Sequence, residues 1–279
     1  MSTPTMTPVA PGRTERRVAV QPVTPPRVLR SEWIKLRSLR STKITLLVSF
    51  LLMAGIGLLT AAITASQWSH LSASSRASFD AVSTVLQGHQ FAQLAIGVLG
   101  VLVISSEYSS GMIRSTFAAV PTRLPVLWAK AGVFSVVTLV TMTIASLVAF
   151  FSGMAVLSSH HLQVALSAPG VTRAVFGAAL YLAVVGLLGV GLGALLRNTA
   201  GAIASLVGLL LLVPPLVGLL PSTISTHITP YLPSNAGEAL LNVHHQAGSL
   251  SPWAGFALMC GYAVVALAAA AFVVRRRDA

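Results

Sequence analysis

The sequence predicts an all-α membrane protein with six transmembrane helices. Of its 279 residues, 54% are hydrophobic and only 9% are charged. Several apolar runs reach the roughly 20 residues that a helix needs to cross a bilayer. The Lys and Arg residues gather at the two ends of the chain and in alternate connections between these runs, which is typical of a multi-pass membrane protein. We therefore expect a bundle of spanning helices.

The chain begins with a polar segment that is rich in Pro, Thr and Arg. Such a composition does not support a packed core, so we expect residues 1–26 to be a disordered cytosolic tail. Residues 27–43 are expected to form an amphipathic helix that lies in the headgroup layer of the membrane. On this helix Leu29, Trp33 and Leu36 would share one apolar face, with arginines beside it.

Six apolar runs follow, and each is long enough for one crossing. They cover residues 44–65, 81–104, 126–157, 172–196, 199–220 and 253–274. The second run is the least apolar, because Gln87, Gln90 and Gln93 make its first half polar. The third run is longer than a crossing, so its first turns, including Lys130, are expected to project into water. Residues 44–279 would form one transmembrane domain.

The distribution of positive charge indicates how the chain is oriented. Of its eighteen Lys and Arg residues, only Arg76 and Arg173 fall in connections on the far side from the N-terminus. Connections that stay in the cytosol carry most of the Lys and Arg. Because the number of crossings is even, this pattern places both termini in the cytosol. The net charge of +12 is then a signal of topology, and a nucleic-acid partner is not expected.

The sequence lacks the motifs that several classes of function require. There is no GxxxxGK[ST] motif for a nucleoside triphosphate, no HExxH or GxSxG motif for hydrolysis, and no charged residue in the middle of a run to couple ions. We expect neither an enzyme nor a directly bound cofactor, and another polypeptide would supply any energy. The pairs His160/His161 and His244/His245 leave two interpretations open, a metal site or ordinary polar outer loops, and no further ligand completes a metal site.

Small residues and prolines distinguish the fourth and fifth runs. Gly186, Gly189 and Gly193 share one helix face and are expected to permit close helix packing, with a substrate path as the alternative. Pro214 and Pro215 remove amide donors and must kink or end the fifth helix. The segment between the fifth and sixth runs is expected to form short outer or re-entrant helices packed on the bundle.

The connection between the second and third runs is polar and is broken by Gly and Pro. It reads SSEYSSGMIRSTFAAVPTRLPVLWAK over residues 105–130. The charge distribution places it in the cytosol. Ser105, Ser106 and Glu107 carry side-chain oxygens that can cap a new helix and favour its positive end. We expect that helix over about residues 109–119.

This short helix has the composition of a docking element. Gly111 permits close approach of a partner, and Met112, Ile113 and Phe117 provide apolar side chains. Pro121 ends the helix. A short, half-apolar helix on the inner face of a membrane protein suits binding in a groove of a soluble partner. An ordinary charged cytosolic loop is the alternative.

The same segment resembles the second-to-third connection of the ABC-2 type permeases, the membrane subunits of ATP-binding-cassette exporters. In that family a Glu is followed, after three residues, by Gly-Thr-[Ile/Leu]-Arg, and further on by a Pro, an Arg and a Lys. The corresponding residues here are Glu107, Gly111, Met112, Ile113, Arg114, Pro121, Arg123 and Lys130. Met112 stands where Thr is usual. The stretch LRSEWIKLRSLRSTK also resembles the interfacial helix of these permeases, with Glu32, Trp33, Lys35 and Leu36 in the familiar order.

The resemblance implies a coupling helix over about residues 107–120 that inserts into a cleft of a separate ATPase subunit. Glu107 and Arg114 would fix the shape and the angle of this helix. The coupling residues would be Glu107, Tyr108, Gly111, Met112, Ile113, Arg114, Pro121 and Arg123. The helix over residues 27–43 would contact the membrane surface and the ATPase, although a simple membrane anchor explains it equally well.

By this likeness, the chain is the permease half of an exporter in the plasma membrane of a bacterium. It would assemble with two ATP-binding subunits, which hold ATP and Mg, with a second permease copy or a paralogue, and with membrane lipids. The cargo would be amphipathic: a drug-like natural product, a peptide or a lipid. Gln87, Gln90 and Gln93 would line its path or form a loop-like start of the second helix. The alternatives are a non-transporting sensor or assembly subunit of such an ATPase, and a secondary transporter.

Overall fold

The computed structural model describes residues 24–119, 123–244 and 248–276. Within these ranges the chain is helical and contains no strand. Six helical segments are long and apolar enough to cross a membrane, which confirms the predicted number. They are Arg40–His70, Ala81–Ser109, Leu124–His160, Val171–Leu196, Thr199–Gly218 and Pro252–Arg276. Nearly all of the expected N-terminal tail lies outside the described residues.

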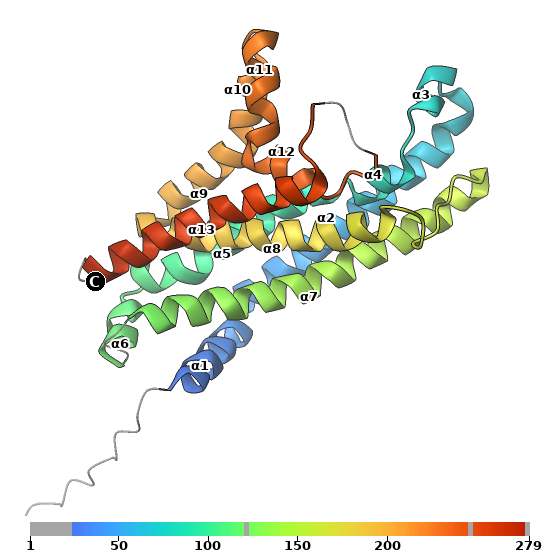
Figure 1. Ribbon diagram of the computed structural model, residues 1–279. Helices are drawn as coiled ribbons and strands as arrows, with labels where there is room; N and C mark the ends of the chain where they lie inside the picture. The colour runs from blue at the N-terminus through green and yellow to red at the C-terminus, as the bar shows by residue number, and fades with distance from the viewer. Residues whose placement is uncertain (1–23, 120–122, 245–247, 277–279) are drawn as a thin grey trace, which may run out of the picture.

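The spanning helices form an elongated bundle around α8 (Val171–Leu196). This helix packs against α5 (His89–Ser109), α7 (Leu124–Leu157) and α13 (Pro252–Arg276), while α2 (Arg40–Gln67) packs on α5 and α7. Figure 1 shows α1 (Pro25–Ser38), α6 (Met112–Ala119) and the C-terminal end of α13 at one end of the bundle, and α3 (Ala73–Ala77) at the other, while α11 (Ser222–Ile228) stands out from its side. The two ends of the described chain thus lie on the same side, as an even number of crossings requires.

Glycines allow α5 and α8 to approach closely. A Cβ atom added to Gly100 would lie 2.2 Å from the carbonyl oxygen of Gly186, and one added to Gly189 would lie 2.3 Å from that of Gly97. A Cβ atom on Gly193 would lie 2.9 Å from the carbonyl oxygen of Val101. These distances leave no room for a side chain, so the predicted packing role of the glycine face is confirmed.

The N-terminal helix α1 runs from Pro25 to Ser38 and is separated from α2 by Leu39, whose backbone is extended. Proline is favoured in the first turn of a helix, where its missing amide hydrogen has no partner to lose. The first spanning helix therefore begins at Arg40, earlier than predicted. Of the three apolar residues predicted to share a face of α1, Leu36 is buried, whereas Leu29 and Trp33 are 43% and 46% exposed.

The second crossing consists of two helices, α4 (Ala81–Leu86) and α5. Asp80 caps α4 by accepting hydrogen bonds from the amides of Val82 and Ser83. The chain then turns at Gln87 and Gly88, and a Cβ atom on Gly88 would lie 2.3 Å from the carbonyl oxygen of Met53 on α2. The polar start of this run is therefore a helix break packed against its neighbour.

The predicted helix cap at the start of the connection between the second and third crossings is wrong. Ser105, Ser106 and Glu107 lie inside α5, which continues to Ser109. Ser105 instead accepts a hydrogen bond from Thr199 on α9 (Thr199–Val207) at 2.9 Å, and Glu107 binds lysines from other helices. The helix break falls at Gly111, whose φ of 71° is readily available only to glycine. The short helix α6 then runs from Met112 to Ala119.

The fifth crossing begins as α9 (Thr199–Val207), widens into a π-helical turn over Gly208–Leu212 and ends as α10 (Val213–Gly218). The prolines lie in the first turn of α10, and the chain continues through them while it bends away from the bundle (Figure 1). The predicted alternative that this helix ends at the prolines is therefore wrong.

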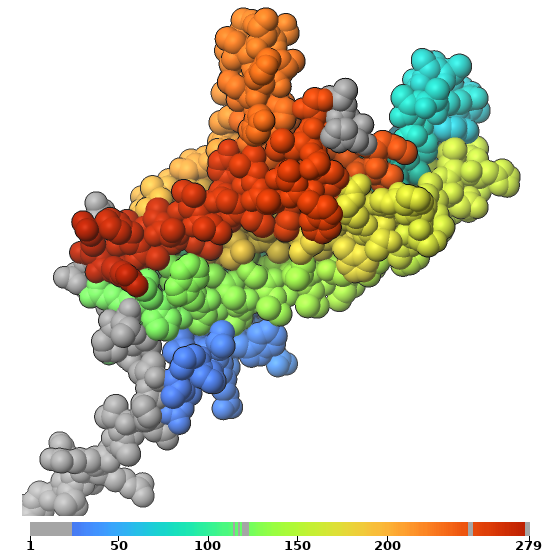
Figure 2. Space-filling model, viewed as in Figure 1, coloured from blue at the N-terminus to red at the C-terminus, as the bar shows by residue number. Residues whose placement is uncertain are grey.

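Two short helices follow the fifth crossing and differ in how they pack. The helix α11 (Ser222–Ile228) has no buried residue and forms, with α10, a column that stands out from the bundle, which Figure 2 shows in space-filling form. The expectation that it packs on the bundle is wrong. The helix α12 (Pro233–Glu238) does pack, against α13 and α8. On the same side of the molecule, α3 (Ala73–Ala77) projects from the connection after α2.

Candidate functional site

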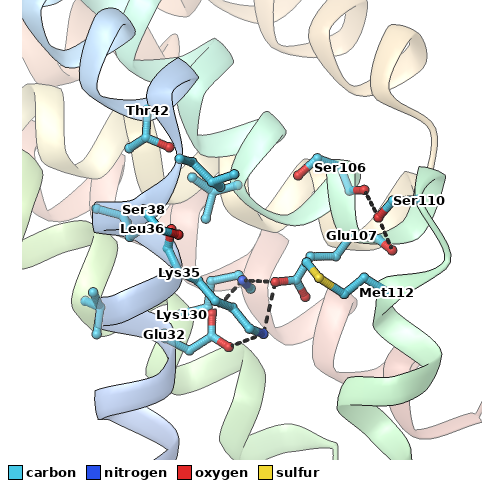
Figure 3. A pocket seen from close by; sticks show the side chains of 13 residues that line it. Glu32, Lys35, Leu36, Ser38, Thr42, Ser106, Glu107, Ser110, Met112 and Lys130 are labelled. Carbon is cyan, nitrogen blue, oxygen red and sulfur yellow. Dashed lines mark hydrogen bonds and ion pairs between the residues drawn. The ribbon is translucent and has the colours of Figure 1, made fainter.

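Four charged side chains from three helices meet at the end of the bundle that carries α6. Lys130 of α7 donates to Glu32 Oε2 of α1 at 2.6 Å and to Glu107 Oε1 of α5 at 2.8 Å. Lys35 of α1 donates to Glu32 Oε1 at 2.8 Å and to Glu107 Oε1 at 3.2 Å. Each lysine thus bridges both carboxylates, and the ring of contacts closes (Figure 3). We refer to these four residues as the ion-pair cluster.

The ion-pair cluster is buried almost completely. The side chains of Glu32, Glu107 and Lys130 are each 4% exposed, and that of Lys35 is 27% exposed. Two carboxylates and two ammonium groups give a net charge of zero. Charges that are buried in this way remain ionised only while each is paired, and loss of one partner leaves an uncompensated charge. The cluster therefore fastens α1 to α5 and α7.

Burial of Lys130 corrects the prediction that it projects into water. It lies in the second turn of α7, where the length of the apolar run places it beyond the bilayer. However, α1 packs across this end of α7, so that the side chain is covered by protein. The length of one helix does not reveal such cover from another helix.

Lys35 keeps its positive charge despite its partial burial. Burial alone would lower the pKa of this ammonium group. Hydrogen bonds and Coulombic attraction from Glu32 and Glu107 act in the opposite direction and outweigh the loss of hydration, so the net effect raises the pKa above its usual value of 10.5. At neutral pH the group is an ammonium ion that can donate to both carboxylates.

The helix α6 contacts the ion-pair cluster with one side and faces outward with the other. Lys35 Nζ lies 3.5 Å from Thr116 Oγ1, and Ile113 is buried against the bundle. Met112, Ser115 and Ala118 are exposed and recur at three-residue intervals, so they form one outward face. A movement of α6 would therefore be transmitted directly to Lys35.

The remaining predicted coupling residues surround this arrangement. Tyr108 lies on α5 with the guanidinium carbon of Arg197 at 5.2 Å from the centre of its ring, which is within the range of a cation–π contact. Arg123 precedes α7 and has a positive φ of 56°. Arg114 belongs to α6, but its side chain lies outside the described part of the structure, as does the whole of Pro121.

A cavity of about 370 Å³ lies beside the ion-pair cluster. Figure 3 shows the side chains that line it, which come from α1, α2, α5, α6 and α7. Besides the cluster, the lining combines aliphatic side chains with hydroxyl groups: Leu36, Ser38, Leu39, Thr42, Val103, Ser106, Ser110, Met112 and Val133. The volume is within the range of small-ligand sites.

The three glutamines proposed for a substrate path do not share one surface. Gln93 is buried and accepts a hydrogen bond from the hydroxyl group of Tyr181 on α8, whereas Gln90 is exposed and Gln87 is half-buried at the break after α4. Gln87 and Gln93 therefore have the environment of a packed helix turn. Nearby, His89 Nε2 lies 3.5 Å from Glu238 Oε1 of α12.

The described residues contain no group of three or more His, Cys, Asp or Glu side chains that could hold a metal ion. His160 and His161 are exposed at the end of α7, and the partner of His244 in the sequence, His245, lies outside the described residues. The candidate site consists of four paired charges, a cavity and a short helix.

Sequence reasoning named Glu32 and Lys35 in one motif and Glu107 and Lys130 in another, but missed that the four side chains meet in one cluster. One signal was present, since Glu32 and Glu107 are two of only six acidic residues and both flank spanning runs.

Comparison of the chain with models of known protein families finds no match. Comparison with curated protein sequences finds no match either.

Proposed function

We propose that this chain is the transmembrane subunit of an ABC-2 type exporter, driven by ATP that a separate subunit hydrolyses. The observation that carries the proposal is the two-sided position of α6. One side of this helix contacts the ion-pair cluster, and the other presents Met112, Ser115 and Ala118 to a partner. The likeness of residues 107–123 to the coupling segment of ABC-2 permeases supports an ATP-binding subunit as that partner.

The ion-pair cluster explains how the spanning helices would respond to the ATPase. Binding of ATP would bring two ATP-binding subunits together and displace the two α6 helices with them. Because Lys35 contacts Thr116 on α6 and also binds carboxylates on α1 and α5, the displacement would reach several helices at once. Buried, paired charges resist separation, so these helices would move as a rigid body.

The proposed assembly contains two membrane chains and two ATP-binding subunits in the plasma membrane of a bacterium, with both termini in the cytosol. The cargo would be an amphipathic compound. This chain would supply the path and the coupling, and ATP and Mg would be bound by the partner. The absence of charge from the middle of the apolar runs supports an external source of energy over a proton or sodium gradient.

The proposal is tested by blocking the outward face of α6. Ser115→Arg places a long cation on that face, and Ser74→Arg makes the same exchange at an exposed position of α3 at the other end of the molecule. Each variant is co-expressed with the ATP-binding protein that we expect a neighbouring reading frame to encode, and both are purified. We expect Ser115→Arg to lose co-purification and ATPase stimulation, whereas Ser74→Arg retains both.

Two further outcomes separate this function from its rivals. If both variants co-purify equally with the ATPase, α6 is not the coupling element and the proposal fails. If coupling depends on α6 but proteoliposomes accumulate none of a panel of amphipathic compounds with ATP, the chain is a sensor or assembly subunit. Efflux that persists without the ATPase and stops when the proton gradient is removed would identify a secondary transporter.

A further inference from the structure

The cavity beside the ion-pair cluster contains an acceptor without a donor. Glu107 Oε1 accepts from both lysines, but Glu107 Oε2 is buried and has no hydrogen-bond partner among the described residues. Both oxygens of Glu32, in contrast, are bound to a lysine. A buried acceptor that is left unpaired costs about 1–3 kcal/mol, so native structures rarely retain one without a ligand or an ordered water. The side chain of Glu107 lines the cavity, and Oε2 would accept from a donor held there once the carboxylate turns toward it.

The balance of charge limits what that donor can belong to. The cluster is neutral, so a ligand with a net charge would bring an uncompensated charge into a largely buried site. A zwitterion avoids this cost, because its cation would lie at Glu107 Oε2 and its anion near Lys35. Lys35 is the most exposed of the four charges, and its contact with Thr116 is its longest, at 3.5 Å. An incoming anion can therefore reach this ammonium group.

The position of the cavity favours a lipid over a soluble zwitterion. Leu36, Leu39, Val103 and Val133 give the cavity aliphatic walls, and Leu39 is also 46% exposed at the junction of α1 and α2. Trp33 and Leu29 are exposed on α1. Exposed Trp and Leu on a basic helix next to spanning helices are typical of the level of the lipid headgroups.

We infer that this cavity binds the headgroup of phosphatidylethanolamine from the leaflet on the α6 side of the membrane. The primary ammonium group donates to Glu107 Oε2, the phosphate lies near Lys35 Nζ, and the glycerol and upper acyl carbons lie between the aliphatic walls. A bound lipid would connect α1, α5 and α7 next to α6. The inference requires only that the six helices span a membrane, and it does not depend on the identity of the motor.

Phosphatidylcholine provides a matched probe, because it differs from phosphatidylethanolamine only by three N-methyl groups that remove every N–H donor. The full-length chain in detergent is titrated with lipids of identical acyl chains, and bound lipid is counted by native mass spectrometry. We expect phosphatidylethanolamine to bind about tenfold more tightly, as the loss of one charge-assisted hydrogen bond predicts. In the mono-, di- and trimethylated series the affinity should fall at the third methyl group, which removes the last N–H.

Cavity-filling substitutions provide the second test. Val133→Trp puts an indole ring into the cavity, whereas Val136→Trp makes the same exchange at a position that is 60% exposed on the outside of α7. We expect only Val133→Trp to lose the preference for phosphatidylethanolamine. Equal affinity of the wild-type chain for phosphatidylethanolamine and phosphatidylcholine would overturn the inference, and the cavity would then hold only water. Loss of the preference in both variants would also overturn it, since binding would then lie outside the cavity.

Discussion

Glu32 on α1 accepts a 2.6 Å hydrogen bond from Lys130 on α7, although 98 positions of the sequence separate them. This pair, together with Lys35 and Glu107, attaches a helix that does not cross the membrane to two helices that do. The attachment lies beside α6, the element that we propose to receive the movement of an ATPase. The stability of this junction and its coupling function therefore depend on the same side chains.

Removal of Lys130 should destabilise the protein strongly. Lys130→Met leaves two buried carboxylates with Lys35 alone, and we expect a loss of about 3–5 kcal/mol in the free energy of unfolding. The control is Lys43→Met, whose side chain is exposed and should change stability by no more than about 0.5 kcal/mol. Unfolding in mixed micelles, followed by circular dichroism, gives both values. Equal effects would mean that the cluster does not hold the helices together.

Exchange of the two charges should restore part of this stability. Glu32→Lys and Lys130→Glu each place like charges side by side, and the double variant returns an opposite pair at the same contact. We expect the double variant to be more stable than either single variant. The ranking of the three unfolding midpoints checks this. A double variant that is less stable than both singles would contradict the pairing.

The contribution of Lys35 should disappear at high pH. Because its pKa is raised in the folded state, the charged form stabilises the fold fully below the usual value of 10.5, and this stabilisation is lost as the pH rises through the folded value. We expect the difference in unfolding free energy between wild type and Lys35→Met to be constant from pH 7 to about 10 and to shrink above that. A difference that grows with alkaline pH would have the wrong sign for this ion pair.

A methyl group between α5 and α8 should be costly. In Gly189→Ala the new Cβ atom would lie 2.3 Å from the backbone oxygen of Gly97, so the helices must separate. We expect a loss of roughly 1–3 kcal/mol in stability. Gly261→Ala on α13 meets nothing within 4 Å and should be neutral or slightly stabilising. Thermal unfolding monitored by size-exclusion chromatography compares the two, and similar midpoints would contradict the close approach of α5 and α8.

Cysteine labelling tests the proposed orientation. In a Cys260→Ala background, which removes the one native cysteine, Ser115→Cys on α6 and Ser74→Cys on α3 introduce exposed thiols at opposite ends of the molecule. A membrane-impermeant maleimide applied to intact cells should label the thiol at position 74 and leave the thiol at position 115 unlabelled until the cells are opened. The reverse pattern would place α6 outside the cell and exclude it as a docking element for a cytosolic ATPase.

The number of crossings was predictable from the sequence, but the details of the end that carries α6 were not. Run length and hydropathy are local properties, so all six spans were found, and the glycine face of α8 was also evident. Lys130 and the cap at Glu107 were assigned wrongly because both depend on α1, which packs across the bundle from a distant part of the sequence. Local chemistry favours a cap at Glu107, whereas its partners in the fold are lysines of α1 and α7.

The wide turn Gly208–Leu212 gives the fifth crossing a degree of freedom that an ideal α-helix lacks. There the amide of Val213 donates to the carbonyl of Gly208, five residues back, so the turn holds one residue more than an α-helical turn. If the surplus residue migrates by one turn, every side chain between its old and new positions rotates by about 100° around the helix axis. That turn of the fifth crossing could then change the face that it presents to lipid or to a neighbouring subunit while its backbone hydrogen bonds are largely kept.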